Sequence, residues 1–144
     1  MPVKTRHVDR SLFRNYLRKA QENFETVRDC IDNGRWNAAV MNAVHCGINA
    51  CDAVTVFTIG LRHAGERHED AIALLQSLNL GTEVLSSKTR QLSRLLGVKN
   101  AAEYEERLMA QGDAQEAAAN AVRHLRWAEE LLASRNPRSR SGMR

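Results

Sequence analysis

The stretch from Arg35 to Ile59, RWNAAVMNAVHCGINACDAVTVFTI, most constrains what this chain can fold into. Apolar residues recur along it at helical spacing, and most of the other positions are small or apolar. A helix that is apolar around most of its circumference must be covered on several sides. We therefore expect a helix over residues 35–62 that forms the centre of a helical bundle.

The remainder of the chain also has the composition of a helical protein. Strong helix formers, Ala, Leu, Glu, Arg and Gln, are abundant, and the two prolines, Pro2 and Pro137, lie near the ends. The sequence contains no strand-like alternation bounded by turn residues. The predicted fold class is therefore all-α. A length of 144 residues fits one domain over 10–134, with a flexible lead over 1–9 and a disordered basic tail over 135–144.

Apolar spacing and turn residues predict where the individual helices begin and end. Apolar residues from Phe13 to Ile31 are spaced by alternate steps of four and three, which is typical of a bundle helix. Asn33-Gly34 ends that helix, and so short a connection predicts an antiparallel hairpin with the next helix. The alanine-rich first half of the last helix is expected to pack against the small residues Ala43, Gly47 and Cys51 of the central helix. The later helices are expected over 67–79, from Thr82 to a weak point at Gly97, over 99–110, and from a candidate cap at Asp113 to Ser134.

The net charge of +4 is concentrated in the tail, which contains four arginines and no acidic residue. The rest of the chain is therefore neutral, so the folded body is not a nucleic-acid-binding platform by bulk charge. Any basic patch would be local or would be supplied by the tail. Lys88, Arg90 and Arg94 on one predicted helix are candidates for phosphate contacts, and a plain solvated face is the alternative.

All three cysteines, Cys30, Cys46 and Cys51, fall within predicted helices, and they include no C-x-x-C pair. Such thiols are expected to be buried as small hydrophobic groups. The N-terminus lacks an apolar signal region, and no run of about 18 apolar residues occurs. These features favour a soluble, cytoplasmic protein that does not enter a membrane.

Short motifs for phosphate loops, nucleophilic serines and zinc proteases are missing from the sequence. His63 and His68 are five residues apart, which is off-phase on a helix, and Gly65 separates them. Neither a metal nor a cofactor is therefore expected.

Polar residues form a narrow line along the otherwise apolar central helix. At about 100° per residue, four of them fall within an arc of roughly 80°: Asn42, His45, Asn49 and Asp52. Three interpretations are open: a solvated stripe, an interface or groove between flanking apolar residues, and an active site with His45 as a base oriented by Asp52 or Asn49. Because Asp52 is about two helical turns from His45, a direct hydrogen bond between them within one helix is not expected.

The order of these features resembles that of HEPN-domain proteins. The matching pieces span residues 12–134 and are NAAVMNAVHCGINACDAV, the loop into RHEDAIALL, TRQLSRLLGVKNAAEYEE and EAAANAVRHLRWAEELL. The resemblance implies an up-and-down antiparallel bundle of four long helices plus a short extra helix, often as a homodimer. Many members are metal-independent endoribonucleases with an Arg, four to six residues and then a His. Others have lost that motif and bind RNA or act beside a nucleotidyltransferase, and many occur in toxin–antitoxin or defence systems.

The Arg-to-His motif has one formal match, Arg62 followed by five residues and His68. This match spans the predicted turn after the central helix, whereas the family motif usually lies near the start of the last long helical region. At that place the chain has Lys99, Asn100 and Tyr104 and no histidine. These three residues are candidates for a degraded site that binds rather than cleaves.

The combined prediction is a non-catalytic HEPN-type module that binds RNA, a nucleotide or a partner protein such as a nucleotidyltransferase. One alternative is a metal-independent endoribonuclease that uses Arg62 and His68, with His45 as a further candidate. A purely structural oligomeric protein is the other alternative. Convergence of Arg62 and His68 in one cleft would favour the enzyme, and burial of the polar line by another chain would favour the structural protein.

Overall fold

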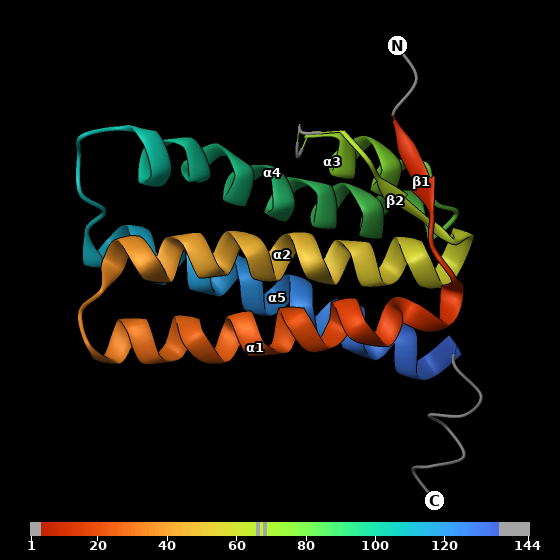
Figure 1. Cartoon of the computed structure of the whole chain (residues 1–144), viewed down its shortest axis with the longest axis horizontal. Coiled ribbons are helices and arrows are strands. Elements are labelled where there is room, and N and C mark those ends of the chain that lie inside the picture. Colours follow the sequence, from red (N-terminus) through yellow and green to blue (C-terminus); the bar gives the residue numbers. More distant parts are fainter. Residues whose placement is uncertain (1–3, 66, 68, 136–144) are drawn as a thin grey trace, which may run out of the picture.

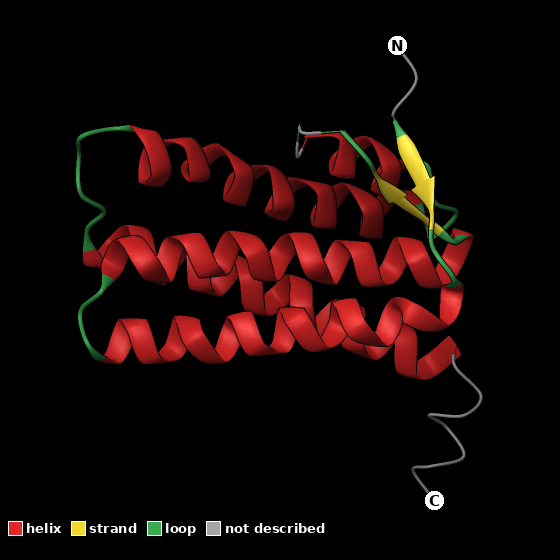
Figure 2. Cartoon of the chain, viewed as in Figure 1, coloured by secondary structure: helices red, strands yellow, loops and turns green. Residues whose placement is uncertain are grey.

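The computed structural model describes residues 4–65, 67 and 69–135 (Figure 1). Helices dominate this part of the chain, and two short strands form a small ribbon at one end (Figure 2). The all-α class is therefore confirmed. Successive long helices run in alternate directions in Figure 1. In chain order the elements are β1 (Thr5–His7), a 3-10 turn (Arg10–Leu12), α1 (Phe13–Asp32), α2 (Trp36–Ile59), β2 (Leu61–His63), α3 (Glu69–Gln76), α4 (Thr82–Tyr104) and α5 (Gln111–Arg135).

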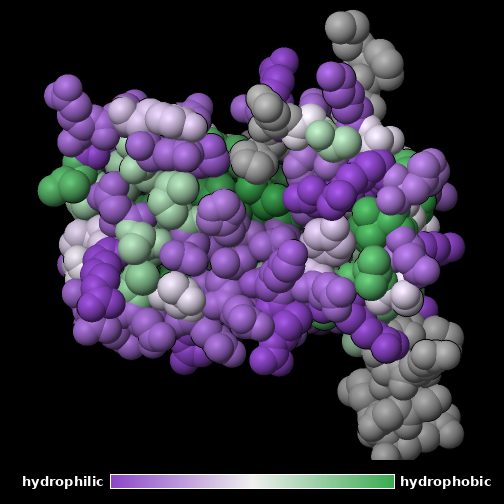
Figure 3. Space-filling model, viewed as in Figure 1, coloured by the Kyte–Doolittle hydropathy of each residue, from purple (hydrophilic) through white to green (hydrophobic). Residues whose placement is uncertain are grey.

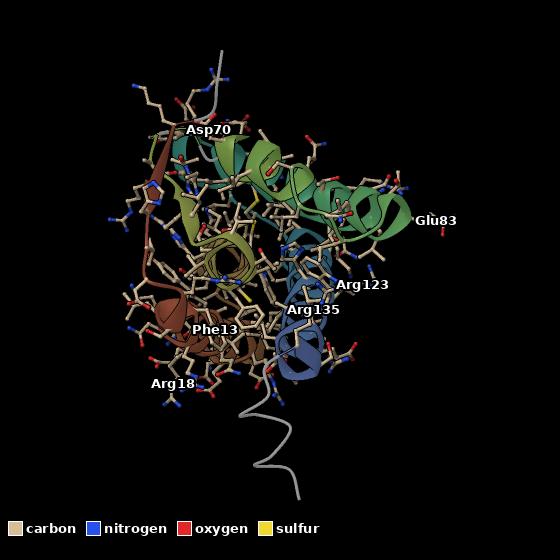
Figure 4. The ribbon with its side chains drawn as sticks, turned by 90° about the vertical axis from the view of Figure 1, so that its right-hand side faces the viewer. Phe13, Arg18, Asp70, Glu83, Arg123 and Arg135 are labelled. Atoms are coloured by element: carbon tan, nitrogen blue, oxygen red, sulfur yellow. The ribbon has the colours of Figure 1, made fainter. Side chains whose placement is uncertain are left out.

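The apolar residues of the helices are gathered around α2. The face shown in Figure 3 is mostly hydrophilic, and the view along the bundle in Figure 4 shows α2 surrounded by α1, α3, α4 and α5. α2 is long and apolar enough to cross a membrane, by length and composition only. However, 72% of its most apolar 18-residue segment is buried inside the bundle. The prediction that this helix is central is confirmed, and burial within the bundle accounts for its apolar character.

α2 and α4 approach each other closely at Gly47. A Cβ atom added at this glycine would lie 2.6 Å from Cδ1 of Leu95 and 3.5 Å from Cδ1 of Leu92. Gly47 therefore faces two large side chains of α4. The prediction that it packs against the alanines of the last helix is wrong at this residue.

We expect Gly47→Val to lower the free energy of unfolding by about 2 kcal/mol, because extra side-chain volume in a tightly packed core forces neighbours out of their preferred rotamers. Urea denaturation followed by circular dichroism measures the change. Gly97→Val is the matched control, since a Cβ added at Gly97 would meet no described atom within 4 Å beyond its chain neighbours and the adjacent backbone of its own helix, and valine is the better helix former. Equal losses for the two variants would contradict the close approach at Gly47.

The chain turns sharply after α2 and pairs with its own N-terminal segment. Gly60 adopts a left-handed conformation with φ 65°, which ends the helix. β2 then runs antiparallel to β1, with Arg6 opposite Arg62, and Val8 N–H donates to Gly60 O at 3.0 Å. The expected helix end at residue 62 and the expected loose lead over Thr5–His7 are therefore both wrong. Residues 1–3 and 136–144 of the predicted lead and tail lie outside the described residues.

α4 is longer than predicted, because it continues through Gly97 to Tyr104. The separate helix expected over 99–110 is therefore wrong. Asn37 of α2 holds the end of α4, since its Nδ2 donates to Ala102 O at 3.1 Å and its Oδ1 accepts from Met109 N–H at 2.7 Å. This contact between helices far apart in the sequence fixes both the end of α4 and the loop that follows.

Candidate functional site

Asp52 is a buried carboxylate in the C-terminal half of α2. Its side chain is 1% exposed, its Oδ2 accepts a hydrogen bond from Nε of Arg62 at 2.8 Å, and its Oδ1 lies 3.3 Å from Nδ1 of His63. A carboxylate buried without such partners would strongly destabilise the fold. Arg62 is 26% exposed, so it links the buried carboxylate to the surface. Asp52 thereby fixes the position of Arg62 on β2.

The strand ribbon places a second guanidinium beside the first. Arg6 on β1 is directly opposite Arg62 on β2, and residues directly opposite in an antiparallel pair lie on the same face. Like charges in this arrangement are unfavourable unless they are compensated. Arg62 is compensated by Asp52, whereas Nη2 of Arg6 donates to the neutral Tyr16 hydroxyl at 3.3 Å. The ribbon therefore carries an excess of positive charge.

Tyr16 of α1 lies at the centre of these cations. Cζ of Arg62 and Nζ of Lys19 each lie 5.6 Å from the centre of the Tyr16 ring. A cation over an aromatic face is attracted by the negative potential of the ring. We call Arg6, Tyr16, Lys19 and Arg62 the Tyr16 cluster. Within the described part of the chain, Asp52 is the only carboxylate that forms an ion pair with a member of this cluster.

The chemistry of the Tyr16 cluster suits an anion that also carries a flat ring. Guanidinium and ammonium groups donate charge-assisted hydrogen bonds to phosphate oxygens. The Tyr16 ring is half-buried, and a base that displaces Lys19 from its face can stack on it. His63 has little support as a general base, because its imidazole is 3% exposed and lies 3.3 Å from the buried carboxylate of Asp52.

The polar line predicted on α2 is divided by its neighbours in the structure. His45 is exposed and Asn42 bonds within its own helix, but Nδ2 of Asn49 donates to Oδ1 of Asn23 on α1 at 2.9 Å. Asp52 is buried against the residues of β2. The solvated-stripe interpretation is therefore wrong for Asp52. The pairing of His45 with Asp52 is also wrong, because the carboxylate accepts a hydrogen bond from Arg62 and lies against His63 instead.

The two residues of the formal nuclease motif have different outcomes. Arg62 belongs to the Tyr16 cluster and is held by Asp52 on its buried side. His68 lies outside the described residues. The third candidate, His45, is exposed on the surface of α2 and faces Glu103 of α4.

Lys99, Asn100 and Tyr104 all lie on the last turns of α4. Nζ of Lys99 is 2.7 Å from Oε2 of Glu103 and 5.6 Å from the centre of the Tyr104 ring. The hydrogen bond from Lys99 is the main cause that lowers the pKa of the Glu103 carboxyl. Asn100 is exposed. Because Glu103 neutralises Lys99, these residues form no cationic surface for a phosphate.

The predicted phosphate contacts on α4 also do not form one patch. Lys88 is half-buried, with its Nζ 5.8 Å from the centre of the Trp127 ring on α5. Burial lowers the pKa of this amine, and nearby Arg123 lowers it further. Arg94 lines a shallow groove together with two acidic residues of α5, and Arg90 is exposed.

Buried cysteines provide no reactive group. Cys30, Cys46 and Cys51 are buried and form no disulfide, as predicted. Burial, with a smaller contribution from Glu129, raises the pKa of the Cys46 thiol to about 12, and burial likewise raises the pKa of Cys51. Thiols of this kind are poor nucleophiles and poor metal ligands. Among residues 4–65, 67 and 69–135, no three His, Cys, Asp or Glu side chains are grouped to hold a metal ion.

Sequence reasoning missed the Tyr16 cluster, although one local signal was present. The segment KTRHVDRSLFRNYLRK, residues 4–19, contains six lysines and arginines and a single acidic residue, Asp9. A scan of protein-family models found none that matches this chain, and a search of curated proteins found no similar sequence. The site is therefore interpreted from its own chemistry.

Proposed function

We propose that this chain is a cytoplasmic, HEPN-like helical module that binds single-stranded RNA through the Tyr16 cluster and does not cleave it. The observation that carries this proposal is the gathering of Arg6, Lys19 and Arg62 around one tyrosine ring. The four long helices of alternating direction and the short α3 are compatible with an up-and-down HEPN-like bundle. That compatibility is the reason for choosing RNA among polyanions.

Single-stranded RNA offers both groups that the Tyr16 cluster can recognise. Phosphates bound by Lys and Arg release their counterions, which makes the binding favourable and dependent on salt. Unpaired bases can stack on an aromatic ring without regard to sequence. Arg62 is positioned in advance by Asp52, so binding does not have to immobilise that side chain.

We expect Tyr16→Ala to weaken binding of a labelled single-stranded oligoribonucleotide about tenfold, because base stacking on an aromatic side chain contributes about 1–3 kcal/mol. Tyr16→Phe keeps the ring and should retain most of the affinity. Fluorescence anisotropy at low salt measures both variants. Equal affinities for wild type and Tyr16→Ala would rule out stacking on this ring.

The same titrations at several salt concentrations test the cations. Lys19→Ala should reduce the slope of log affinity against log salt by about 0.7, which is the value for one lost phosphate contact on a single strand. Arg90→Ala removes an exposed cation from α4 and is the matched control. If Arg90→Ala reduced the slope as much as Lys19→Ala, RNA binding would be due to the overall charge of the protein rather than to the Tyr16 cluster.

Incubation with RNA in EDTA separates binding from the endoribonuclease alternative. Wild-type protein should bind RNA and leave it intact, since Arg62 is engaged with Asp52. Arg62→Ala and His68→Ala are tested alongside. Cleavage by the wild type that is lost in both variants would replace the proposed binding function with the metal-independent nuclease.

A further inference from the structure

The last residue of α4 and the loop that follows it present two large apolar side chains to solvent. Tyr104 is 73% exposed and Leu108 is 78% exposed, more than any other large hydrophobic residue described. Glu105 and Glu106 lie between them, and in the described part of the chain neither glutamate forms an ion pair. We call residues 104–108 the acidic loop.

Hydrogen bonds on both sides fix the acidic loop in place. Asn37 binds the backbone of α4 before the loop and Met109 N–H after it. Asp113 Oδ2 accepts from Ala110 N–H at 2.8 Å and lies 3.3 Å from Nη1 of Arg107. Because α5 begins at Gln111, Asp113 lies within its first turn and bonds back to the residue before the helix, so the predicted helix start at Asp113 is wrong. Apolar side chains held outward on a fixed loop are typical of a surface that contacts another molecule.

A groove of about 380 Å³ lies at the other end of the bundle, over the end of α2. Its lining combines apolar side chains, among them Ile59 and Leu80, with the cations Arg10 and Arg135. Arg10 is fixed, because its Nε donates to Phe57 O at 2.8 Å and its Nη2 donates to Thr58 O at 3.1 Å. Other N–H groups of its five-donor guanidinium are left for a ligand. We call this groove the end groove.

We propose that the acidic loop of one copy of this chain docks in the end groove of a second copy. Leu108 would contact the apolar lining, and Glu105 and Glu106 would face Arg10 and Arg135. The acidic loop carries apolar side chains and carboxylates, and the end groove carries apolar side chains, the fixed guanidinium of Arg10 and the exposed guanidinium of Arg135. The two surfaces are therefore complementary in both apolar character and charge. Exposed hydrophobic groups are visible at both ends of the face in Figure 3.

The two surfaces lie too far apart to meet within one chain. They are separated by α5, whose 25 residues span about 37 Å, and they lie at opposite ends of the bundle in Figure 1. Contact between copies is therefore head to tail, which produces open chains or rings rather than a closed two-fold dimer. This arrangement differs from the homodimer that the HEPN resemblance implies, and it does not depend on the proposed RNA binding.

Two variants that each damage one surface test the proposal. Leu108→Asp disables the acidic loop and leaves the end groove, whereas Ile59→Asp disables the groove and leaves the loop. Sedimentation velocity over about a hundredfold range of protein concentration, without RNA, should show wild-type oligomers that grow with concentration and weaken with salt. Each variant alone should be monomeric. Their equimolar mixture should form a heterodimer and nothing larger, because only one intact loop and one intact groove can meet.

Val84→Asp is the matched control, since Val84 and Ile59 are both 41% exposed and Val84 does not line the end groove. This variant should associate like the wild type. Circular dichroism and the urea midpoint confirm that all three variants are folded. A monomeric wild type at every concentration would overturn the proposal. A dimer that grows no further, or two variants that fail to combine, would also overturn it.

Discussion

Asp52→Ala should lower the free energy of unfolding by about 3 kcal/mol, because removing one partner of a buried ion pair leaves the other charge without compensation. Arg62 would lose the bond at 2.8 Å, and His63 would lose the carboxylate that lies 3.3 Å from its Nδ1. Urea denaturation followed by circular dichroism measures this loss. Replacing both charges, in Asp52→Leu with Arg62→Met, should recover most of the stability, because no unpaired charge then remains.

Glu22→Ala is the matched control for this prediction. Nε of Arg18 lies 2.8 Å from Oε2 of Glu22, the same distance as in the Asp52–Arg62 pair, but both side chains are largely exposed. Water screens such a pair, so its removal should leave the urea midpoint within error of wild type. Similar losses in the free energy of unfolding for Asp52→Ala and Glu22→Ala would show that burial does not determine how much an ion pair contributes to stability.

Replacing His124 with leucine should raise stability and remove a large part of its dependence on pH. His124 on α5 is 0% exposed, and neither of its ring nitrogens has a hydrogen-bond partner among the described residues. A buried polar group without a partner is unfavourable, so His124→Leu should be more stable by about 1–2 kcal/mol at pH 7. Burial, with a smaller contribution from Lys88, lowers the pKa of His124 to about 3.

The lowered pKa fixes the sign of the pH effect. Below the ordinary histidine value of 6.5 the unfolded chain binds a proton that the folded chain does not bind until the pH approaches 3, so stability falls as the pH falls. The advantage of His124→Leu over wild type should therefore grow by about 4 kcal/mol between pH 7 and pH 3. Denaturant titrations at several pH values measure this growth.

A neighbouring buried residue supplies the control for the pH experiment. Leu125→Met changes a 5% exposed side chain without adding or removing an ionisable group. Its effect on the free energy of unfolding should be the same at every pH. A pH-dependent difference between His124→Leu and wild type can then be assigned to His124 rather than to the carboxylates. Parallel stability curves for His124→Leu and wild type would contradict a buried neutral imidazole.

Local sequence patterns predicted much of the bundle correctly. The steps of four and three from Phe13 onward match α1, and the small and apolar residues of α2 match its central position. These predictions succeed because the spacing of apolar residues on one face of a helix can be read in the sequence of that helix alone. The three-residue strands were missed, since each depends on pairing with a segment more than fifty residues away and neither is long enough to show alternation.

The Tyr16 cluster could not be predicted from local sequence patterns. Arg6 comes from β1, Tyr16 and Lys19 come from α1, and Arg62 comes from β2, so no single helix or strand contains the site. The surplus of cations over residues 4–19 could have indicated a basic surface. It could not indicate that Arg62 joins that surface, because this depends on the turn at Gly60 and on the buried carboxylate of Asp52.

The sequence by itself determined the helical class of this protein and its central helix, because burial of a nearly all-apolar helix requires other helices around it. Only the tertiary structure decided the role of Asp52. On a helical projection this residue belongs with the polar line of Asn42 and His45, but the folded chain covers it with β2. A helix sequence specifies which residues share a face, whereas the neighbouring elements determine whether that face meets water, another side chain or a ligand.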